Sequence, residues 1–156
     1  MHVGNPQTVT LCDTPNPSAV RILVHDHTHV AAALNAALET GRAIVLIGGG
    51  GEAMGRPWFR HMITQSAALY PSARWQAVID CGTAVGFALA ALADGAAAIR
   101  LRASSTVLER IRDIARQTGA VVDEGTEPVL DLSVQSDPLA ACRIWCASGE
   151  SLWKQP

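Results

Sequence analysis

The sequence predicts a single-domain α/β fold: a mostly parallel, open sheet of about five strands with helices on both faces, doubly wound in a flavodoxin- or Rossmann-like manner. Short apolar, β-branched runs alternate along the chain with longer segments whose apolar residues recur every three or four positions. Such alternation builds βαβ units, whose strands are parallel. The chain has 156 residues. This length suits one domain and falls short of the roughly 250 residues of a (β/α)8 barrel.

The individual elements follow from these runs. Buried strands are expected at residues 20–25, 43–47, 75–80, 97–101 and 120–122, and residues 129–134 can form one more. Helices are expected at residues 30–40, 57–70, 83–93, 106–118 and 138–147. Gly41 and Gly119 should each end a helix, and Thr106 with Glu109 forms a capping box at the start of the fourth helix.

The two ends of the chain differ from its middle. Residues 1–18 are rich in Pro and Asn and are expected to form an irregular leader, in which residues 8–12 can add a short edge strand. Residues 19–147 form the α/β domain, and residues 148–156 are expected to fray. The leader lacks the charged start and apolar run of a signal peptide, and no stretch is long and apolar enough for a membrane span. We therefore expect a cytoplasmic protein with no membrane partner.

The charge balance argues against a nucleic-acid partner. The chain carries 12 basic and 14 acidic residues, a net charge of -2 with neutral histidines. It has no basic excess with which to neutralise phosphates. In a cytoplasmic protein the four cysteines, Cys12, Cys81, Cys142 and Cys146, are expected to be reduced and to pack as small apolar groups. A metal or redox pair of Cys142 and Cys146 is the alternative.

Ligands of open parallel sheets bind beyond the carboxyl ends of the strands. Residues that follow the expected strands are therefore the candidates for a site. The first strand runs into a histidine-rich stretch, the second into four glycines, and the third into Asp80, Cys81 and Gly82. The fourth ends among arginines and serines, and the fifth at Asp123 and Glu124. We expect the ends of the first three strands to form one cleft.

The glycine run offers a site for an anion. It stands between a buried strand and a helix, where backbone amides and a helix N-terminus can approach a phosphate. The predicted ligand-binding residues are Gly48, Gly49, Gly50, Gly51, Glu52, Thr83 and Arg102. The run lacks the Lys-Ser/Thr of a P-loop, and no acidic residue follows about 20 positions on to bind a ribose. Dinucleotide binding is therefore disfavoured. Two interpretations of the glycine run remain, a generic anion site and a flexible turn with no ligand.

The stretch HDHTH after the first strand offers a metal site instead. In extended backbone His25 and His27 point to one face, where two imidazoles and Asp80 can hold zinc or another divalent metal. The alternative is that Asp26 or Thr28 caps the next helix and that the histidines are solvated.

Asp80 and Cys81 are the candidates for catalysis. A thiolate at Cys81 would lie near a helix N-terminus, which lowers the pKa of a thiol, and the histidine-rich stretch can reach it in space as a base. The alternative is a buried cysteine that ends a strand and takes no part in chemistry.

Three functions are compatible with these patterns. The favoured one is a non-catalytic or regulatory domain that binds a small anionic ligand at the carboxyl ends of the strands. The second is a metal-dependent or thiol enzyme that uses His25, His27, Asp80 and Cys81. The third is an interaction subunit. The chain is 49% hydrophobic and only 17% charged, and its residues 83–93 carry no charge, so we expect a homodimer. The sequence identifies neither a substrate nor a cofactor.

Overall fold

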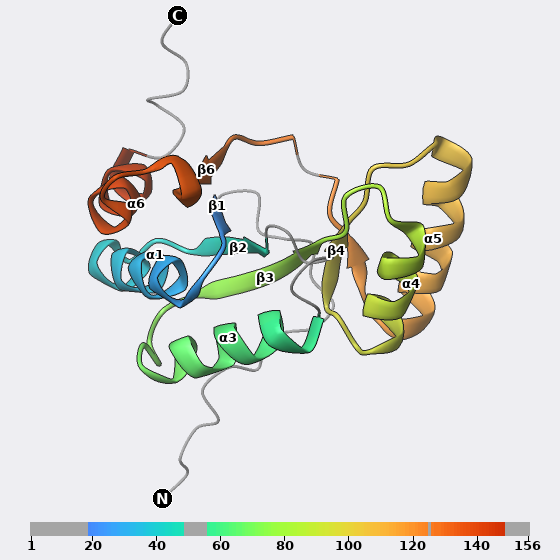
Figure 1. Cartoon of the computed structure of the whole chain (residues 1–156), viewed down its shortest axis with the longest axis horizontal. Coiled ribbons are helices and arrows are strands. Elements are labelled where there is room, and N and C mark those ends of the chain that lie inside the picture. The colour runs from blue at the N-terminus through green and yellow to red at the C-terminus, as the bar shows by residue number, and fades with distance from the viewer. Residues whose placement is uncertain (1–18, 49–55, 125, 149–156) are drawn as a thin grey trace, which may run out of the picture.

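A computed structural model describes residues 19–48, 56–124 and 126–148 of the chain. The strands in these ranges are β1 (Val20–Val24), β2 (Ile44–Gly48), β3 (Trp75–Asp80), β4 (Ala98–Arg100), β5 (Val121–Val122) and β6 (Val129–Asp131). The helices are α1 (His27–Thr40), α3 (Arg56–Ala68), α4 (Val85–Ala93), α5 (Ser105–Thr118) and α6 (Pro138–Ser148), with a short 3-10 turn, η1 (Leu132–Val134), after β6. Strands and helices alternate as predicted, and the α/β class is confirmed (Figure 1). No helix in these ranges has the length and apolarity to cross a membrane.

The strands form one parallel sheet in the order β5-β4-β3-β2-β1-β6. From β1 the chain winds outwards to β5 and then returns to the other side of β1, which is the reversal of a doubly wound sheet. The sheet has six strands rather than about five because residues 129–131 pair with β1. Val24 is in register with Gly48, and Gly48 with Ile79, so the carboxyl ends of neighbouring strands lie together.

The helices described here pack on one face of this sheet. Side chains of α1, α3 and α6 form a core cluster with Ile22 and Leu46, and side chains of α4 and α5 form another with Ile99. Ile79 packs against both clusters, so they share a face. Right-handed crossovers that advance in one direction place their helices on the same side. The opposite face, where further helices were expected, carries a cluster of strand and adjoining residues: Ala19, Leu23, Ala43, Val45, Ile47, Val78, Ala98 and Val129.

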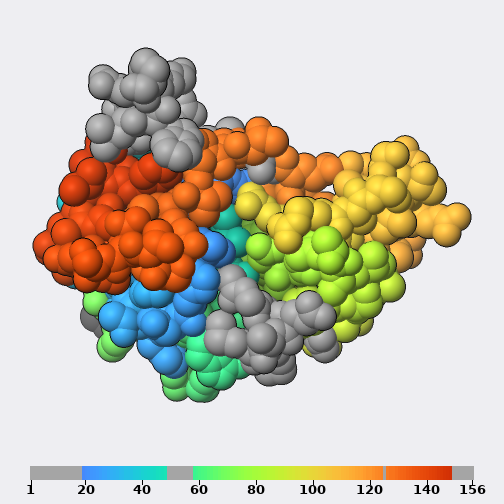
Figure 2. Space-filling model, turned by 45° about the horizontal axis from the view of Figure 1, so that its top comes forward, coloured from blue at the N-terminus to red at the C-terminus, as the bar shows by residue number. Residues whose placement is uncertain are grey.

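The sheet curves around that opposite face. A flat sheet would separate β1 from β5 by about 19 Å, which is four strand spacings of about 4.8 Å. Yet Arg21 on β1 bonds to Asp123, the residue that follows β5. Arg21 alternates with Ile22 and so lies on the face away from the helices. The helices form an arc outside the curve (Figure 1), and the connection from β5 to β6, in orange, crosses from the α5 side to the α6 side (Figure 2).

The start of α5 differs from the prediction. Ser104 is its N-cap, with Oγ accepting a hydrogen bond from Val107 N at 3.4 Å, and the helix begins at the next residue. Thr106 and Glu109 therefore lie inside the helix and do not form a capping box at its start. The predicted ends of α1 and α5 are confirmed, since a glycine with left-handed backbone follows each.

The cysteines in the described ranges are buried and form no disulfide: Cys81, Cys142 and Cys146. The thiols of Cys142 and Cys146 belong to the core cluster that α6 shares with α1. Burial raises the pKa of Cys142 to about 12, which keeps it protonated. These two cysteines therefore act as small apolar groups, as predicted, and Cys12 lies outside the described residues.

Gly48, at the end of β2, allows α3 to approach the strand. A Cβ on Gly48 would lie 2.6 Å from Cε2 of Phe59, much closer than carbon atoms can pack. The ring of Phe59 is buried in the core cluster, so it has little room to move away. Glycine at this position is therefore required by helix-on-sheet packing.

We expect Gly48→Ala to lower the free energy of unfolding by about 1–3 kcal/mol, because the added methyl group overpacks the ring of Phe59. Gly86→Ala is the matched control. A Cβ on Gly86 meets nothing within 4 Å, and the residue lies inside α4. This change should raise stability by about 0.5–1 kcal/mol. Urea unfolding of both variants measures the difference, and equal effects would contradict the packing argument.

Candidate functional site

Polar side chains gather at the carboxyl ends of the strands. His25 follows β1, Asp131 ends β6, Asp80 ends β3, Arg100 ends β4 and Asp123 follows β5. All of these strands are parallel, so these residues belong to one end of the curved sheet. This end contains the candidate site, and its charged groups fall into separate clusters.

The first cluster places Asp123 between two arginines inside the curve. The Asp123 carboxylate accepts two hydrogen bonds from the Arg21 guanidinium, one of them from Nη1 at 3.1 Å, and one from Arg100 Nη2 at 2.9 Å. Arg21 Nε also donates to Glu127 Oε2 at 3.3 Å. The side chains of Arg21 and Asp123 are only 5% and 3% exposed, so both charges are buried. The cluster ties β1 to β4 and to the end of β5.

The charged groups of this cluster form ion pairs with one another. Burying a carboxylate costs several kcal/mol, and charge-assisted bonds to two guanidiniums offset that cost. With Glu127 the cluster holds two cations and two anions. Arg21 and Arg100 thus already have buried or half-buried carboxylates as partners, and we assign them a structural role.

The second cluster lies where β1 and β6 run side by side. His25 Nε2 lies 2.9 Å from Asp131 Oδ1, and the same oxygen accepts from Ser133 N at 2.9 Å and from Ser133 Oγ at 2.7 Å. Burial acts to raise the pKa of Asp131, but the hydrogen bonds from Ser133 and His25 outweigh it and lower that pKa. Asp131 is therefore held as a carboxylate that orients the His25 imidazole, beside the strand at which the winding reverses.

The histidine-rich stretch caps a helix, as one interpretation of the sequence predicted. Asp26 is the N-cap of α1, and its Oδ1 accepts from His29 N at 2.9 Å. His29 Nδ1 accepts in turn from His25 N at 3.1 Å, so the ring proton of neutral His29 is on Nε2. The rings of His25 and His29 meet edge to face, with centroids 5.7 Å apart. These two histidines are thus fixed by neighbours.

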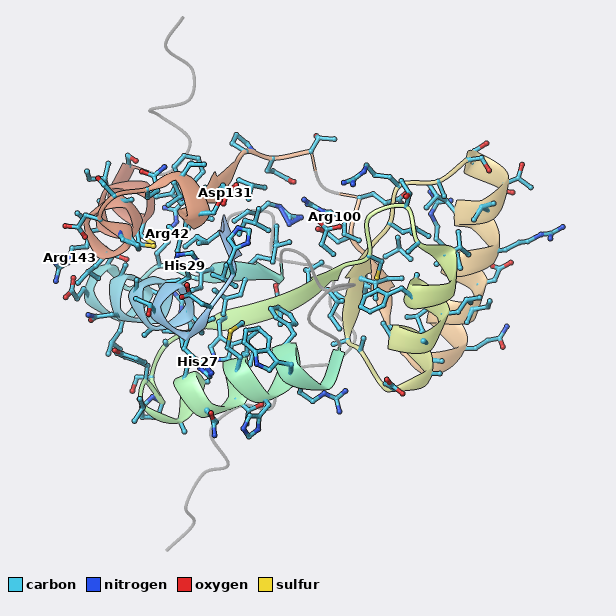
Figure 3. All side chains as sticks on the ribbon, in the orientation of Figure 1. His27, His29, Arg42, Arg100, Asp131 and Arg143 are labelled. Atoms are coloured by element: carbon cyan, nitrogen blue, oxygen red, sulfur yellow. The ribbon has the colours of Figure 1, made fainter. Side chains whose placement is uncertain are left out.

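His27 lies apart from His25. The helix α1 begins at His27, so the backbone is not extended there, and the expectation that the two imidazoles share a strand face does not hold. The ring of His27 instead lies 6.0 Å from that of Trp58 on α3, and Figure 3 shows it on the α3 side of α1, away from Asp131. Among the described residues, no three His, Cys, Asp or Glu side chains are placed to hold a metal ion.

Asp80 and Cys81 are consecutive and therefore face opposite sides of the sheet. Asp80 Oδ1 accepts from Gly82 N at 2.9 Å, which shapes the turn after β3. The buried thiol of Cys81 packs in the cluster of α4 and α5, and its Sγ lies 3.6 Å from Ile79 O. The geometry supports the interpretation of Cys81 as a packed cysteine on the helix side of the sheet.

Of the predicted glycine site, Gly48 alone lies in the described ranges. Gly49, Gly50, Gly51 and Glu52 lie outside them, and their predicted role stays a prediction. The position of Gly48 against Phe59 explains this glycine by packing.

Thr83 lies in the turn between β3 and α4, and Arg102, which follows β4, lies beside that turn. Gly82 in this turn has a φ of 56°, which favours glycine. Arg102 Nη2 lies 3.7 Å from the point that a Cβ on Gly82 would occupy, and Arg102 N donates to Gly82 O at 2.7 Å. Thr83 and Arg102 are both exposed. The helix α4 follows, and its N-cap, Ala84, supplies no side-chain acceptor.

The sequence analysis missed several partners in these clusters, among them Asp131 and Arg21. Asp131 ends a strand that the pattern left optional, and its position beside His25 depends on β6 pairing with β1. Arg21 interrupts an apolar strand, and that interruption is a usable signal, because a charge inside a buried strand needs a counter-charge.

Comparison with known proteins gives no relative: no protein-family model matches the chain, and no curated protein matches its sequence. The geometry of these clusters is therefore the basis for inferring a function.

We expect Asp123→Ala to lower the free energy of unfolding by about 3–5 kcal/mol, since it leaves the buried Arg21 without its main counter-charge. Asp113→Ala is the control. It removes an exposed carboxylate that pairs with Arg116 on the surface, and it should change stability by less than about 0.5 kcal/mol. Chemical unfolding of both variants tests this, and a small loss for Asp123→Ala would show that the network does not stabilise the fold.

The lowered pKa of Asp131 makes stability depend on pH. The folded state favours the ionised Asp131 carboxylate. Its contribution to the free energy of unfolding is therefore complete above pH 3.8, the ordinary pKa, and is lost as the pH falls through the lower pKa of the folded state. Asp131→Asn removes this contribution. We expect the variant to be less stable than the parent at pH 5–7 and the gap to narrow below about pH 3. Urea midpoints across this range measure the gap, and a gap that widens in acid would refute the assignment.

Proposed function

We propose that the domain binds a small anionic ligand, through a phosphate or carboxylate group, at the turn between β3 and α4. The role is one of binding or regulation rather than catalysis. The observation that carries the proposal is that this turn holds an uncapped helix start and the exposed residue Thr83, and that the exposed Arg102, which follows β4, lies beside Gly82 of the same turn.

The helix start contributes backbone donors. The first amides of an α-helix have no partner within the helix, and the aligned peptide dipoles make that end partly positive. In α4 the N-cap Ala84 supplies no acceptor, and the first turn contains no acidic residue. By contrast, α1 and α5 have Asp26 and Ser104 as caps. The start of α4 is therefore suited to an external anion.

Arg102 contributes the charge. Its guanidinium lies over Gly82, and among the described residues it has no acidic side chain as an ion-pair partner. A guanidinium presents donors in a fork that matches carboxylate and phosphate oxygens. Arg100, two residues earlier, is bound to Asp123 and cannot serve in the same way. The exposed hydroxyl of Thr83 adds one more donor in the turn.

The enzyme interpretation has less support. A thiol enzyme needs a base beside the thiol, and the thiol of Cys81 lies in an apolar cluster on the helix side of the sheet. His25 has Asp131 as its partner. These contacts favour the binding interpretation.

Titration with inorganic phosphate, followed by amide NMR or calorimetry, tests the proposal. We expect Arg102→Gln to weaken binding about tenfold or more, because a charge-assisted hydrogen bond is lost. Arg110→Gln makes the same charge change at an exposed position on α5 and should bind as the parent does. Equal affinity in the two variants, or no binding by the parent, would reject the site.

A second variant probes the helix start directly. Ala84→Asp places a carboxylate at the N-cap of α4, where it can accept hydrogen bonds from backbone amides of the first turn. We expect the variant to gain about 0.5–2 kcal/mol of stability and to lose phosphate binding. A variant that is stabilised and still binds phosphate would place the anion elsewhere.

A further inference from the structure

The helix-facing side of β3 is incompletely covered. Trp75, Ala77 and Ile79 point to the helices but are each only half-buried, although β3 is an inner strand of the sheet. The neighbouring strand β2 is buried at every position. Inner strands of parallel sheets are normally covered on both faces. The middle of the sheet thus has an apolar strip that the helices cover only in part.

This strip is the floor of a groove. One wall is α3, and the other is the end of α4 with the connection to β4. The groove has two adjoining hollows of about 540 and 270 Å³. Both are lined by Arg60, Thr64, Ile79 and Ala96. The larger one is within the range of small-molecule sites, about 300–1,000 Å³. A stable protein partner would need an interface of about 1,200 Å² or more, well beyond three floor residues.

A guanidinium is anchored at the rim of this groove. Arg60 Nη2 donates to the backbone oxygen of Asp94 at 2.9 Å, which holds the side chain across the groove from α3. Among the described residues Arg60 has no ion pair with a carboxylate, so its charge can meet that of a ligand. His61 and Asp94 also line the rim.

We infer that this groove is a second binding site, separate from the turn before α4, and that it takes a small carboxylic acid with an apolar, flat body. The body would cover Ile79 and Ala77 on the strand, and the carboxylate would meet the Arg60 guanidinium at the rim. A planar fork of donors fits a carboxylate in a bidentate manner. This inference does not depend on anion binding at Arg102.

Benzoate is the probe, and benzyl alcohol is its uncharged counterpart. The indole N–H resonance of Trp75, which lines the smaller hollow, reports filling of the groove in NMR titrations. We expect benzoate to shift this resonance saturably and benzyl alcohol to bind at least several-fold more weakly. Arg60→Gln should weaken benzoate about tenfold. Equal affinities for the two probes, or an unchanged affinity in Arg60→Gln, would overturn the inference.

Two matched variants locate the probe. Thr64→Trp puts a large ring into the groove from an exposed position of α3, and Gln65→Trp puts the same ring at the next exposed position, which does not line the groove. We expect Thr64→Trp to abolish the benzoate shift and Gln65→Trp to keep it. Arg102→Gln should also keep it, which separates this site from the phosphate site.

Light scattering on the same variants tests the competing occupant, a second copy of the chain. If the parent is a dimer that Thr64→Trp converts to a monomer while Gln65→Trp does not, the groove is a subunit interface and the small-molecule inference is wrong. An unchanged mass together with a lost benzoate shift supports it.

Discussion

The buried carboxylate of Asp123 is the constraint on which the rest of the fold depends. It is nearly inaccessible to water, and its partners, Arg21 and Arg100, stand on β1 and β4. A charge in such a position must be paired. Pairing across that span requires the sheet to curl, because a flat one would hold β1 too far from β5. The curl leaves the helices on the outer side and draws the carboxyl ends of the strands together.

The same constraint separates structural charges from available ones. Arg100 and Arg102 alternate on one strand and its extension, yet their situations differ. Arg100 is half-buried and bound to Asp123, whereas Arg102 is exposed beside Gly82. A basic residue near a strand end is therefore no evidence of a ligand until its internal partners are known. The internal partner of Arg60 is known and is a neutral backbone carbonyl. This hydrogen bond fixes the side chain but does not neutralise its charge.

The local pattern predicted the elements well because apolar runs and glycine stops act within a few residues. It predicted partners poorly because these depend on strand order. His25 bonds to Asp131, 106 positions later, only because β6 returns to the side of β1. Alternation along β3 was, however, sufficient to show that Asp80 and Cys81 face opposite sides. The shared site proposed for them from sequence conflicted with that alternation. The prediction that His27 shares a strand face with His25 failed for a related reason. The extended backbone ends at Asp26, the N-cap of α1, so His27 is already helical.

The apolar composition that predicted a homodimer has a more local explanation. The uncharged helix α4 buries Ala88, Ala91 and Leu92, and among its large apolar side chains Leu89 is exposed by 39%. Much of its apolar character comes from alanines, which expose little area each, so the helix makes no strong demand for a partner. Exposed large apolar side chains such as Leu69, Val134 and Ile144 lie outside the sheet, whereas β3, an inner strand, has half-buried apolar side chains beneath the gap between α3 and α4. Amino-acid composition counts apolar residues but does not say where they lie. In the structure, the half-buried ones on β3 line a groove of small-molecule size. The homodimer itself stays a prediction.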